Sequence, residues 1–144
     1  MRDNKTLLHR LSLWAQDTPD APAHYFKDEN EHWKSISAKS FWEQVCRIAE
    51  ALQKNGLHAG DRVVIYAGNA PEWVQWDLGI ALAGGISVGV HPQAHTNDLK
   101  HMIAQTKPKM IITEADAYRA KLLGLGAKSE TILLFSQTIE WLTE

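Results

Sequence analysis

The chain has 144 residues, 44% of them hydrophobic and 22% charged, with a formal net charge of −2. This length and composition fit one globular domain with a single core. Lysine and arginine form no long run, which argues against a protein that binds a phosphate backbone, so we expect no nucleic-acid partner.

Cys46 is the only cysteine, which excludes an internal disulfide framework, and its place in an amphipathic stretch predicts a small buried residue. The first residues lead into an amphipathic segment rather than the apolar core of a secretory signal. The sequence also holds no run of about 18 apolar residues that could span a membrane. We therefore expect a cytoplasmic protein.

A helix is predicted over residues 6–17, where leucines and Trp14 recur at helical spacing. Two prolines follow and end it. Residues 23–27 and 32–36 are predicted as short strands, and the polar stretch 28–31 between them indicates a hairpin turn.

A second helix is predicted to open at Ser37 and to stop at Asn55-Gly56, because glycine readily adopts positive φ. Its apolar side consists of Phe41, Val45, Ile48, Ala49 and Leu52. Residues 62–67 then form a continuous apolar run, which is typical of a strand buried on both faces.

From residue 69 onward, helices and strands are predicted to alternate. The helices cover 69–83, 96–105, 114–123 and 136–142, and the strands cover 86–90, 109–113 and 131–135. This alternation predicts an α/β fold, an open and mainly parallel sheet with helices on both faces, preceded by an N-terminal helix and a short hairpin.

A search for catalytic motifs finds no glycine-rich phosphate loop, no G-x-S-x-G elbow and no H-E-x-x-H zinc helix. His91 and His95 are four apart, but Pro92 between them is incompatible with a helical metal clamp, so we expect no metal site. Asp77 is expected to be a solvated residue on a helix face. We therefore name no catalytic residue.

Four segments in order are distinctive together: Phe41 to Leu52, Gly56 to Val63 with the pattern G-L-x-x-G-D-R-V, Asn69 to Trp73 with N-x-P-E-W, and Ala83 to Val90. They resemble the opening of the AMP-forming, or adenylate-forming, acyl-CoA synthetases. The stretch Gly-Gly-Ile-Ser-Val-Gly is most similar to the long-chain fatty-acid–CoA ligase branch. The resemblance runs from about residue 6 to residue 113.

Most of the matching residues are expected to build the scaffold. Asp61 and Arg62 would hold polar groups at a strand entrance, Asn69 would cap the following helix, and Trp73 would pack that helix on the sheet.

The resemblance implies an enzyme that activates a fatty acid with ATP and Mg²⁺ to an acyl-adenylate and then passes the acyl group to coenzyme A. It also implies that the phosphate-binding loop, the adenine and ribose motifs and the catalytic lysine lie beyond residue 144. Residues 1–144 are therefore expected to be one incomplete N-terminal subdomain without an internal boundary, shortened either in the gene or by design. This piece alone should be inactive and bind no cofactor.

The resemblance implies one site within the chain. The loop after the second sheet strand borders the channel for the pantetheine arm of coenzyme A, and the matching positions are His91, Pro92 and Gln93. Open α/β sheets bind ligands beyond the carboxyl ends of their strands, which agrees with this placement. The competing interpretation is an ordinary strand-to-helix turn.

Two different interpretations of the whole chain remain open at this point. It could be a stand-alone module that binds a nucleotide, coenzyme A or a protein without catalysis, or it could be an unrelated flavodoxin-like domain. If the chain is part of a ligase, peripheral association of the parent protein with membranes stays open. An uncovered face or sheet edge of residues 1–144 also predicts that this part of the ligase self-associates.

Overall fold

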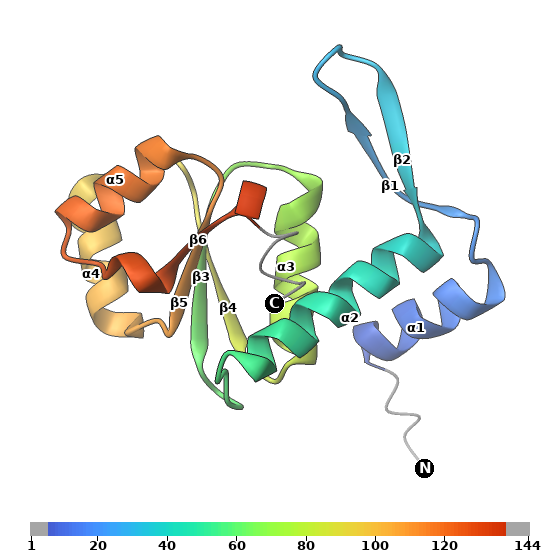
Figure 1. Ribbon diagram of the computed structural model, residues 1–144, viewed down its shortest axis with the longest axis horizontal. Coiled ribbons are helices and arrows are strands. Elements are labelled where there is room, and N and C mark those ends of the chain that lie inside the picture. Colours follow the sequence, from blue (N-terminus) through green and yellow to red (C-terminus); the bar gives the residue numbers. More distant parts are fainter. Residues whose placement is uncertain (1–5, 138–144) are drawn as a thin grey trace.

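The computed structural model describes residues 6–137 (Figure 1). The helices are α1 Leu7–Asp17, α2 Ala38–Lys54, α3 Pro71–Leu82, α4 Thr96–Thr106 and α5 Asp116–Gly124, with short 3₁₀ turns at Ser129–Thr131 and Phe135–Gln137. The strands are β1 Pro22–Lys27, β2 Trp33–Ser37, β3 Arg62–Tyr66, β4 Ile86–Val90, β5 Met110–Thr113 and β6 Ile132–Leu134.

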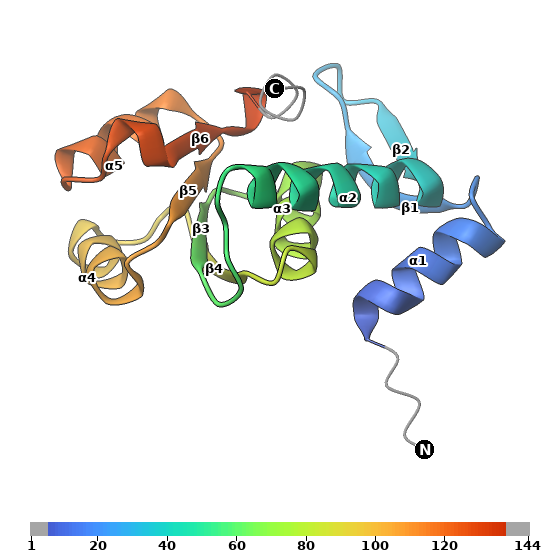
Figure 2. The same ribbon diagram turned by 60° about the horizontal axis from the view of Figure 1, so that its bottom comes forward.

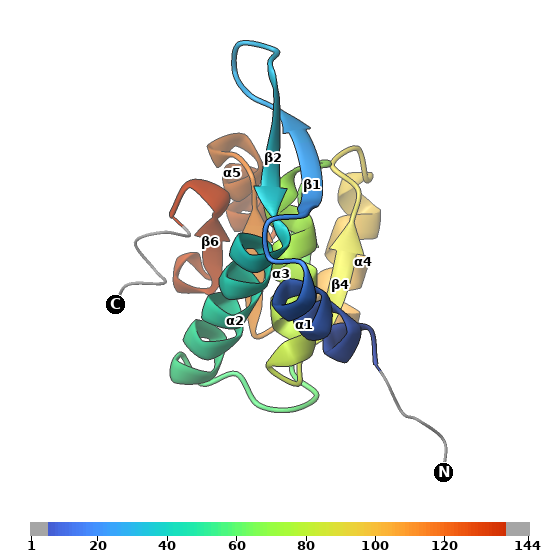
Figure 3. The ribbon, with the colours of Figure 1, turned by 90° about the vertical axis from the view of Figure 1, so that its right-hand side faces the viewer.

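The predicted N-terminal helix and hairpin are confirmed. Thr6 caps α1, because its hydroxyl accepts a hydrogen bond from the His9 N–H at 3.2 Å. Strands β1 and β2 pair antiparallel, and the Asp28 carboxylate closes their turn by accepting from the N–H groups of Asn30 and His32 at 2.9 Å. The hairpin projects beyond the top of the molecule in Figures 1 and 3.

The four later strands form a parallel sheet in the order β4-β3-β5-β6. In its register Val64 on β3 lies between Val88 on β4 and Ile111 on β5. The predicted parallel sheet is therefore confirmed, and β3 is an interior strand with neighbours on both sides.

Alternate residues of β3 enter two separate cores, because successive side chains of a strand point to opposite faces. On one face Val63 and Ile65 pack with α2 and α3; on the other, Val64 and Tyr66 pack with α4 and α5. Figure 2 shows α2 and α3 on one side of the molecule and α4 and α5 on the other. Helices cover both faces, as predicted.

Helices α2 and α3 pack closely at Gly79. A Cβ at this position would lie 2.5 Å from Cγ2 of Ile48 and 3.3 Å from the Val45 carbonyl oxygen. Ile48 is fully buried in the core shared with β3. Only glycine fits here without displacing α2, and the close approach lets α2 and α3 cover the sheet as one layer.

The polar groups predicted at the entrance of β3 are confirmed. The Asp61 carboxylate accepts a hydrogen bond from the His58 N–H at 2.9 Å. Arg62 donates through Nε to the Thr106 carbonyl at 2.7 Å and through a terminal nitrogen to the Gly60 carbonyl at 3.2 Å. These bonds join the start of β3 to the end of α4 and to the turn before β3.

The predicted cap at Asn69 is wrong, and α4 also begins without a capping side chain. Asn69 lies one residue too early, since Ala70 is the N-cap of α3 and forms no side-chain cap bond; Pro71 occupies the first helical position, where a missing N–H costs nothing. Thr96 is already helical, and His95 is the N-cap of α4, again without a side-chain bond. Both helix starts rest on packing rather than on a capping side chain.

Asp77 also differs from its prediction as a solvated residue. Its carboxylate accepts a hydrogen bond from the Ser87 hydroxyl, and both residues are half-buried. The bond joins α3 to β4, so Asp77 is part of the helix–sheet contact. By contrast, Trp73 packs α3 on the sheet as predicted: a Cβ at Gly89 of β4 would lie 3.1 Å from its ring.

Cys46 is half-buried on α2. Burial, together with the nearby Glu43 carboxylate, raises the pKa of its thiol. The helix predicted over 136–142 falls mostly outside the described residues. Within the described part of the chain, no helix combines the length and apolarity needed to cross a membrane.

Candidate functional site

The carboxyl edge of the parallel sheet is the place where the fold favours a ligand. The chain passes from β3 to β4 on one side and then crosses to β5 on the other side of β3. Helices α3 and α4, which make these two connections, cover opposite faces of the sheet. Such a switch point opens a crevice beyond the strand ends in doubly wound sheets.

The loops after β3, β4 and β5 meet at Gly68. A Cβ added there would lie 3.3 Å from both carboxylate oxygens of Glu114 and 3.7 Å from Cγ of Pro92. Gly68 follows β3, Pro92 follows β4 and Glu114 follows β5. A side chain on residue 68 would therefore press against the Glu114 carboxylate and contact Pro92, so glycine lets the loops after β3, β4 and β5 lie close together.

The structure brings His91, Pro92 and Gln93 together in a compact turn at this edge. The Gln93 N–H donates to Nδ1 of His91 at 3.2 Å, and the Ala94 N–H donates to the His91 carbonyl at 2.9 Å. An accepting Nδ1 leaves the neutral imidazole with its proton on Nε2. The side chains of His91 and Gln93 are exposed, while Pro92 is half-buried.

Two side chains that the sequence did not single out support this turn from beneath. The Tyr66 hydroxyl donates to the Pro92 carbonyl at 3.1 Å. Nζ of Lys121 donates to the Ala94 carbonyl at 3.1 Å and to the Tyr66 hydroxyl at 3.2 Å. Lys121 lies 55 residues from Tyr66 along the chain, so no local pattern could reveal the contact.

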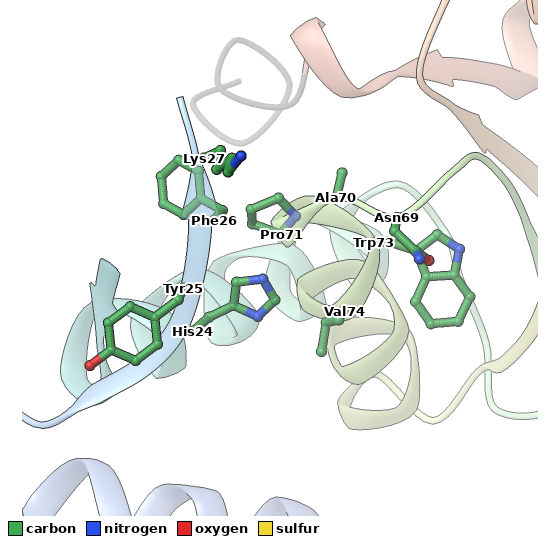
Figure 4. A pocket seen from close by; sticks show the side chains of 9 residues that line it. All are labelled: His24, Tyr25, Phe26, Lys27, Asn69, Ala70, Pro71, Trp73 and Val74. Atoms are coloured by element: carbon green, nitrogen blue, oxygen red, sulfur yellow. The ribbon is translucent and has the colours of Figure 1, made fainter. Parts of the chain in front are cut away.

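A pocket of about 580 Å³ opens beside this edge, between β1 and the start of α3 (Figure 4). Its lining residues are His24, Tyr25, Phe26, Lys27, Asn69, Ala70, Pro71, Trp73 and Val74. Figure 4 shows the His24 ring directed from β1 toward α3. The lining is mostly apolar, and the loop after β3 contributes to it.

Metal-binding groups do not gather at this edge. Across residues 6–137, no three His, Cys, Asp or Glu side chains lie close enough together to hold a metal ion. The chemistry that the edge offers is hydrogen bonding, from Nε2 of His91 and the amide of Gln93, beside the carboxylate of Glu114.

Comparison with known proteins identifies relatives. The model of the AMP-binding enzyme family matches residues 11–142. The chain is 32% identical to the long-chain-fatty-acid–CoA ligase of Bacillus subtilis over 110 residues, which is 76% of this chain and 19% of that protein. It is 37% identical to the acetyl-coenzyme A synthetase of Methylocella silvestris over 107 residues, or 74% of this chain and 15% of that protein. The chain thus spans less than a fifth of these curated relatives.

Solved structures show the same fold. A fatty acyl-adenylate ligase from L. pneumophila, solved with acyl adenylate and pyrophosphate, matches with a TM-score of 0.80 and 20% identity, over 98% of this chain and 25% of that one. The crystal structure of VinN matches with a TM-score of 0.82 and 17% identity, over 95% of this chain and 35% of that one. These similarities confirm the predicted α/β fold and show that it is part of the adenylate-forming ligase fold. The alternative of an unrelated flavodoxin-like domain is therefore wrong.

Proposed function

Because the chain belongs to the AMP-binding enzyme family, we propose that it forms the N-terminal subdomain of a ligase that joins a long-chain fatty acid to coenzyme A. The observation that carries this proposal is the family match over residues 11–142 together with the similarity to a long-chain-fatty-acid–CoA ligase. The four-strand sheet, its helices and the hairpin make one structural unit in this proposal, without an internal boundary.

The reaction has two halves. The fatty-acid carboxylate displaces pyrophosphate from ATP to form an acyl-adenylate, and the thiol of coenzyme A then displaces AMP. In our proposal other segments of the ligase supply the ATP-binding and Mg²⁺-binding groups and the catalytic lysine. Residues 6–137 supply the scaffold, and the chain alone turns over neither substrate.

The loop formed by His91, Pro92 and Gln93 borders the path of the pantetheine arm in this proposal. Its support is the position of the loop at the carboxyl edge of the sheet, where three strand ends meet. Pantetheine carries amide groups, and the exposed Gln93 side chain and His91 ring nitrogen are suitable hydrogen-bonding partners for them.

The test is an assay of the polypeptide obtained by extending the reading frame beyond codon 144. We expect AMP release that requires ATP, Mg²⁺ and a long-chain fatty acid, with acetate a poor substitute. Acetate-dependent AMP release that exceeds the long-chain rate would reassign the substrate to a short acid. A frame that continues into no adenylate-forming motif would remove the ligase proposal.

A stand-alone binding module is distinguished by calorimetry on the 144-residue chain. The ligase proposal expects no heat of binding with either ATP or coenzyme A, because the nucleotide-binding groups come from other segments. Saturable binding of either molecule by the isolated chain would favour the module.

Two further properties belong to the proposal. We place the parent ligase in the cytoplasm, and flotation with vesicles tests whether it also associates with membranes.

We also expect the isolated chain to self-associate through apolar surface, since Trp33 of the hairpin is 68% exposed and Ile86 on the edge strand β4 is 51% exposed. Sedimentation at increasing concentration measures this directly, and a strictly monomeric chain would contradict it.

A further inference from the structure

The turn at residues 91–95 is held from beneath by two side chains from different elements. Tyr66, the last residue of β3, donates its hydroxyl proton to the Pro92 carbonyl at 3.1 Å. Lys121 of α5 donates to the Ala94 carbonyl at 3.1 Å. Two carbonyls two residues apart are thereby fixed against the sheet and against a helix.

The two side chains are also bonded to each other. Nζ of Lys121 donates to the Tyr66 hydroxyl at 3.2 Å, so that hydroxyl both accepts from Lys121 and donates to Pro92. Tyr66 is fully buried, and its ring packs edge-on against Tyr118 with centroids 5.0 Å apart. The hydroxyl therefore has a fixed position, since neither the strand nor the ring can move freely.

The Lys121 ammonium is oriented toward the turn. It is half-buried and lies 5.7 Å from the centre of the Tyr66 ring. Among residues 6–137 no carboxylate forms an ion pair with it. The partial desolvation of the Lys121 ammonium is therefore compensated by its hydrogen bonds to the Ala94 carbonyl of the turn and to the Tyr66 hydroxyl.

We propose that Tyr66 and Lys121 are positioning residues that hold residues 91–95 in one conformation and thereby set the affinity of the ligase for coenzyme A. The second half of this statement rests on the proposed function, and the first half does not. Neither residue touches the reacting atoms in this account. Both act through the backbone of the turn.

The competing explanation is that the pair only stabilises the fold. A purely structural role predicts an equal loss of stability in all parts of the chain and an equal effect on both half-reactions. A positioning role predicts a local change in the turn and an effect confined to the step that uses coenzyme A. Two readouts therefore decide between them.

The first readout is amide hydrogen exchange in the 144-residue chain, measured by NMR. Tyr66→Phe removes the hydroxyl and keeps the ring, and Lys121→Met removes the amine and keeps the unbranched stem. We expect the Ala94 amide, which bonds to His91, to exchange about tenfold faster in either variant, the change produced by losing about 1.4 kcal/mol of hydrogen bonding.

The matched control is Thr113→Val. The Thr113 hydroxyl bonds to the Tyr66 carbonyl at the same sheet edge but does not touch the turn. The Thr113→Val variant should change the exchange rate of the Ala94 amide by no more than its effect on global unfolding accounts for. The double variant Tyr66→Phe/Lys121→Met should change Ala94 exchange by less than the product of the single effects, because the two residues share a bond.

The second readout uses the complete ligase. We expect the KM for coenzyme A to rise about tenfold in both variants, with the rate of fatty-acid-dependent adenylate formation unchanged. Unchanged Ala94 exchange, an equal response in Thr113→Val, or faster exchange with an unaltered KM would each overturn the proposal. If the proposed function is wrong, the wild-type protein forms no acyl-CoA. The hydrogen-exchange data then still decide whether Tyr66 and Lys121 hold the turn.

Discussion

The Thr113 hydroxyl donates a hydrogen bond of 2.8 Å to the carbonyl of Tyr66, joining β5 to β3 at the carboxyl edge of the sheet. Thr113 has no solvent exposure, so its hydroxyl needs a partner within the protein. The bond crosses the switch point of the sheet and fixes the two strand ends from which the loops at Gly68 and Glu114 depart.

Thr113→Val tests the strength of this bond. Valine keeps the shape of the side chain but leaves the buried Tyr66 carbonyl without this donor. We expect the free energy of unfolding to fall by about 1 kcal/mol. Urea denaturation measures the change, and Thr96→Val, at an exposed position on α4, is the control that should alter stability by less than about 0.5 kcal/mol.

Gly79→Ala tests the close packing of α2 against α3. The added methyl would meet Cγ2 of Ile48, and overpacking of this kind costs about 1–3 kcal/mol. Thermal and urea unfolding measure the loss. Gly124→Ala at the end of α5, where a Cβ meets nothing within 4 Å, should change stability by less than about 0.5 kcal/mol. The double variant Gly79→Ala/Ile48→Ala should lose less than the sum of the two single losses, and strict additivity would contradict the packing account.

Ser87→Ala removes the donor that the half-buried Asp77 carboxylate uses. A hydrogen bond to a charged group contributes more than a neutral one, so we expect a loss of about 1.5 kcal/mol in the free energy of unfolding. Asp77→Asn should cost less, because an amide oxygen still accepts from Ser87. Equal stability of Ser87→Ala and the wild type would show that the bond contributes nothing.

Asp61 predicts a specific dependence of stability on pH. The hydrogen bond from the His58 N–H, followed by the charges of His58, Lys109 and Arg62, lowers the pKa of its carboxyl. A lowered folded pKa gives stability that is present above the ordinary aspartate value of about 3.9 and is lost as the pH falls through the folded value. Asp61→Asn should therefore be less stable than the wild type at pH 7; the difference should begin to shrink near pH of about 3.9 and should vanish only below the lowered folded pKa. A difference that is constant with pH would contradict this account.

The proposed pantetheine path predicts a selective kinetic effect in the complete ligase. Gln93→Ala should raise the KM for coenzyme A about fivefold, the cost of about one hydrogen bond, and leave adenylate formation unchanged. Gln53→Ala on α2, which lies outside the turn, is the matched control. Equal losses in both half-reactions would place Gln93 outside the coenzyme A path.

The sequence predicted the sheet and its helices because the signals were local. Each signal spans only a few neighbouring residues of the chain. Examples are the apolar run at β3, the glycine after α2, and the boundaries of β4 at Ile86 and Val90. Gly56 has φ of 80°, as the predicted helix stop requires.

The remaining errors have physical causes that a local pattern does not contain. Asn69 is a suitable capping residue, but the ring of Pro71 disfavours a helical backbone at Ala70, so the helix begins one residue later than an Asn69 cap requires. Asp77 meets Ser87 only because α3 folds back on β4. The support of the 91–95 turn by Lys121 depends on α5 packing beside β3, which no residue near the turn encodes.

Separate measurement of the two half-reactions in the complete ligase tests directly whether this chain belongs to a ligase of fatty acids and coenzyme A. With ATP, Mg²⁺ and a long-chain fatty acid, we expect acyl-adenylate and pyrophosphate without coenzyme A, and equal amounts of AMP and acyl-CoA once coenzyme A is added. A protein that releases no pyrophosphate with any fatty acid, or that forms the adenylate but never transfers it to coenzyme A, would contradict this expectation.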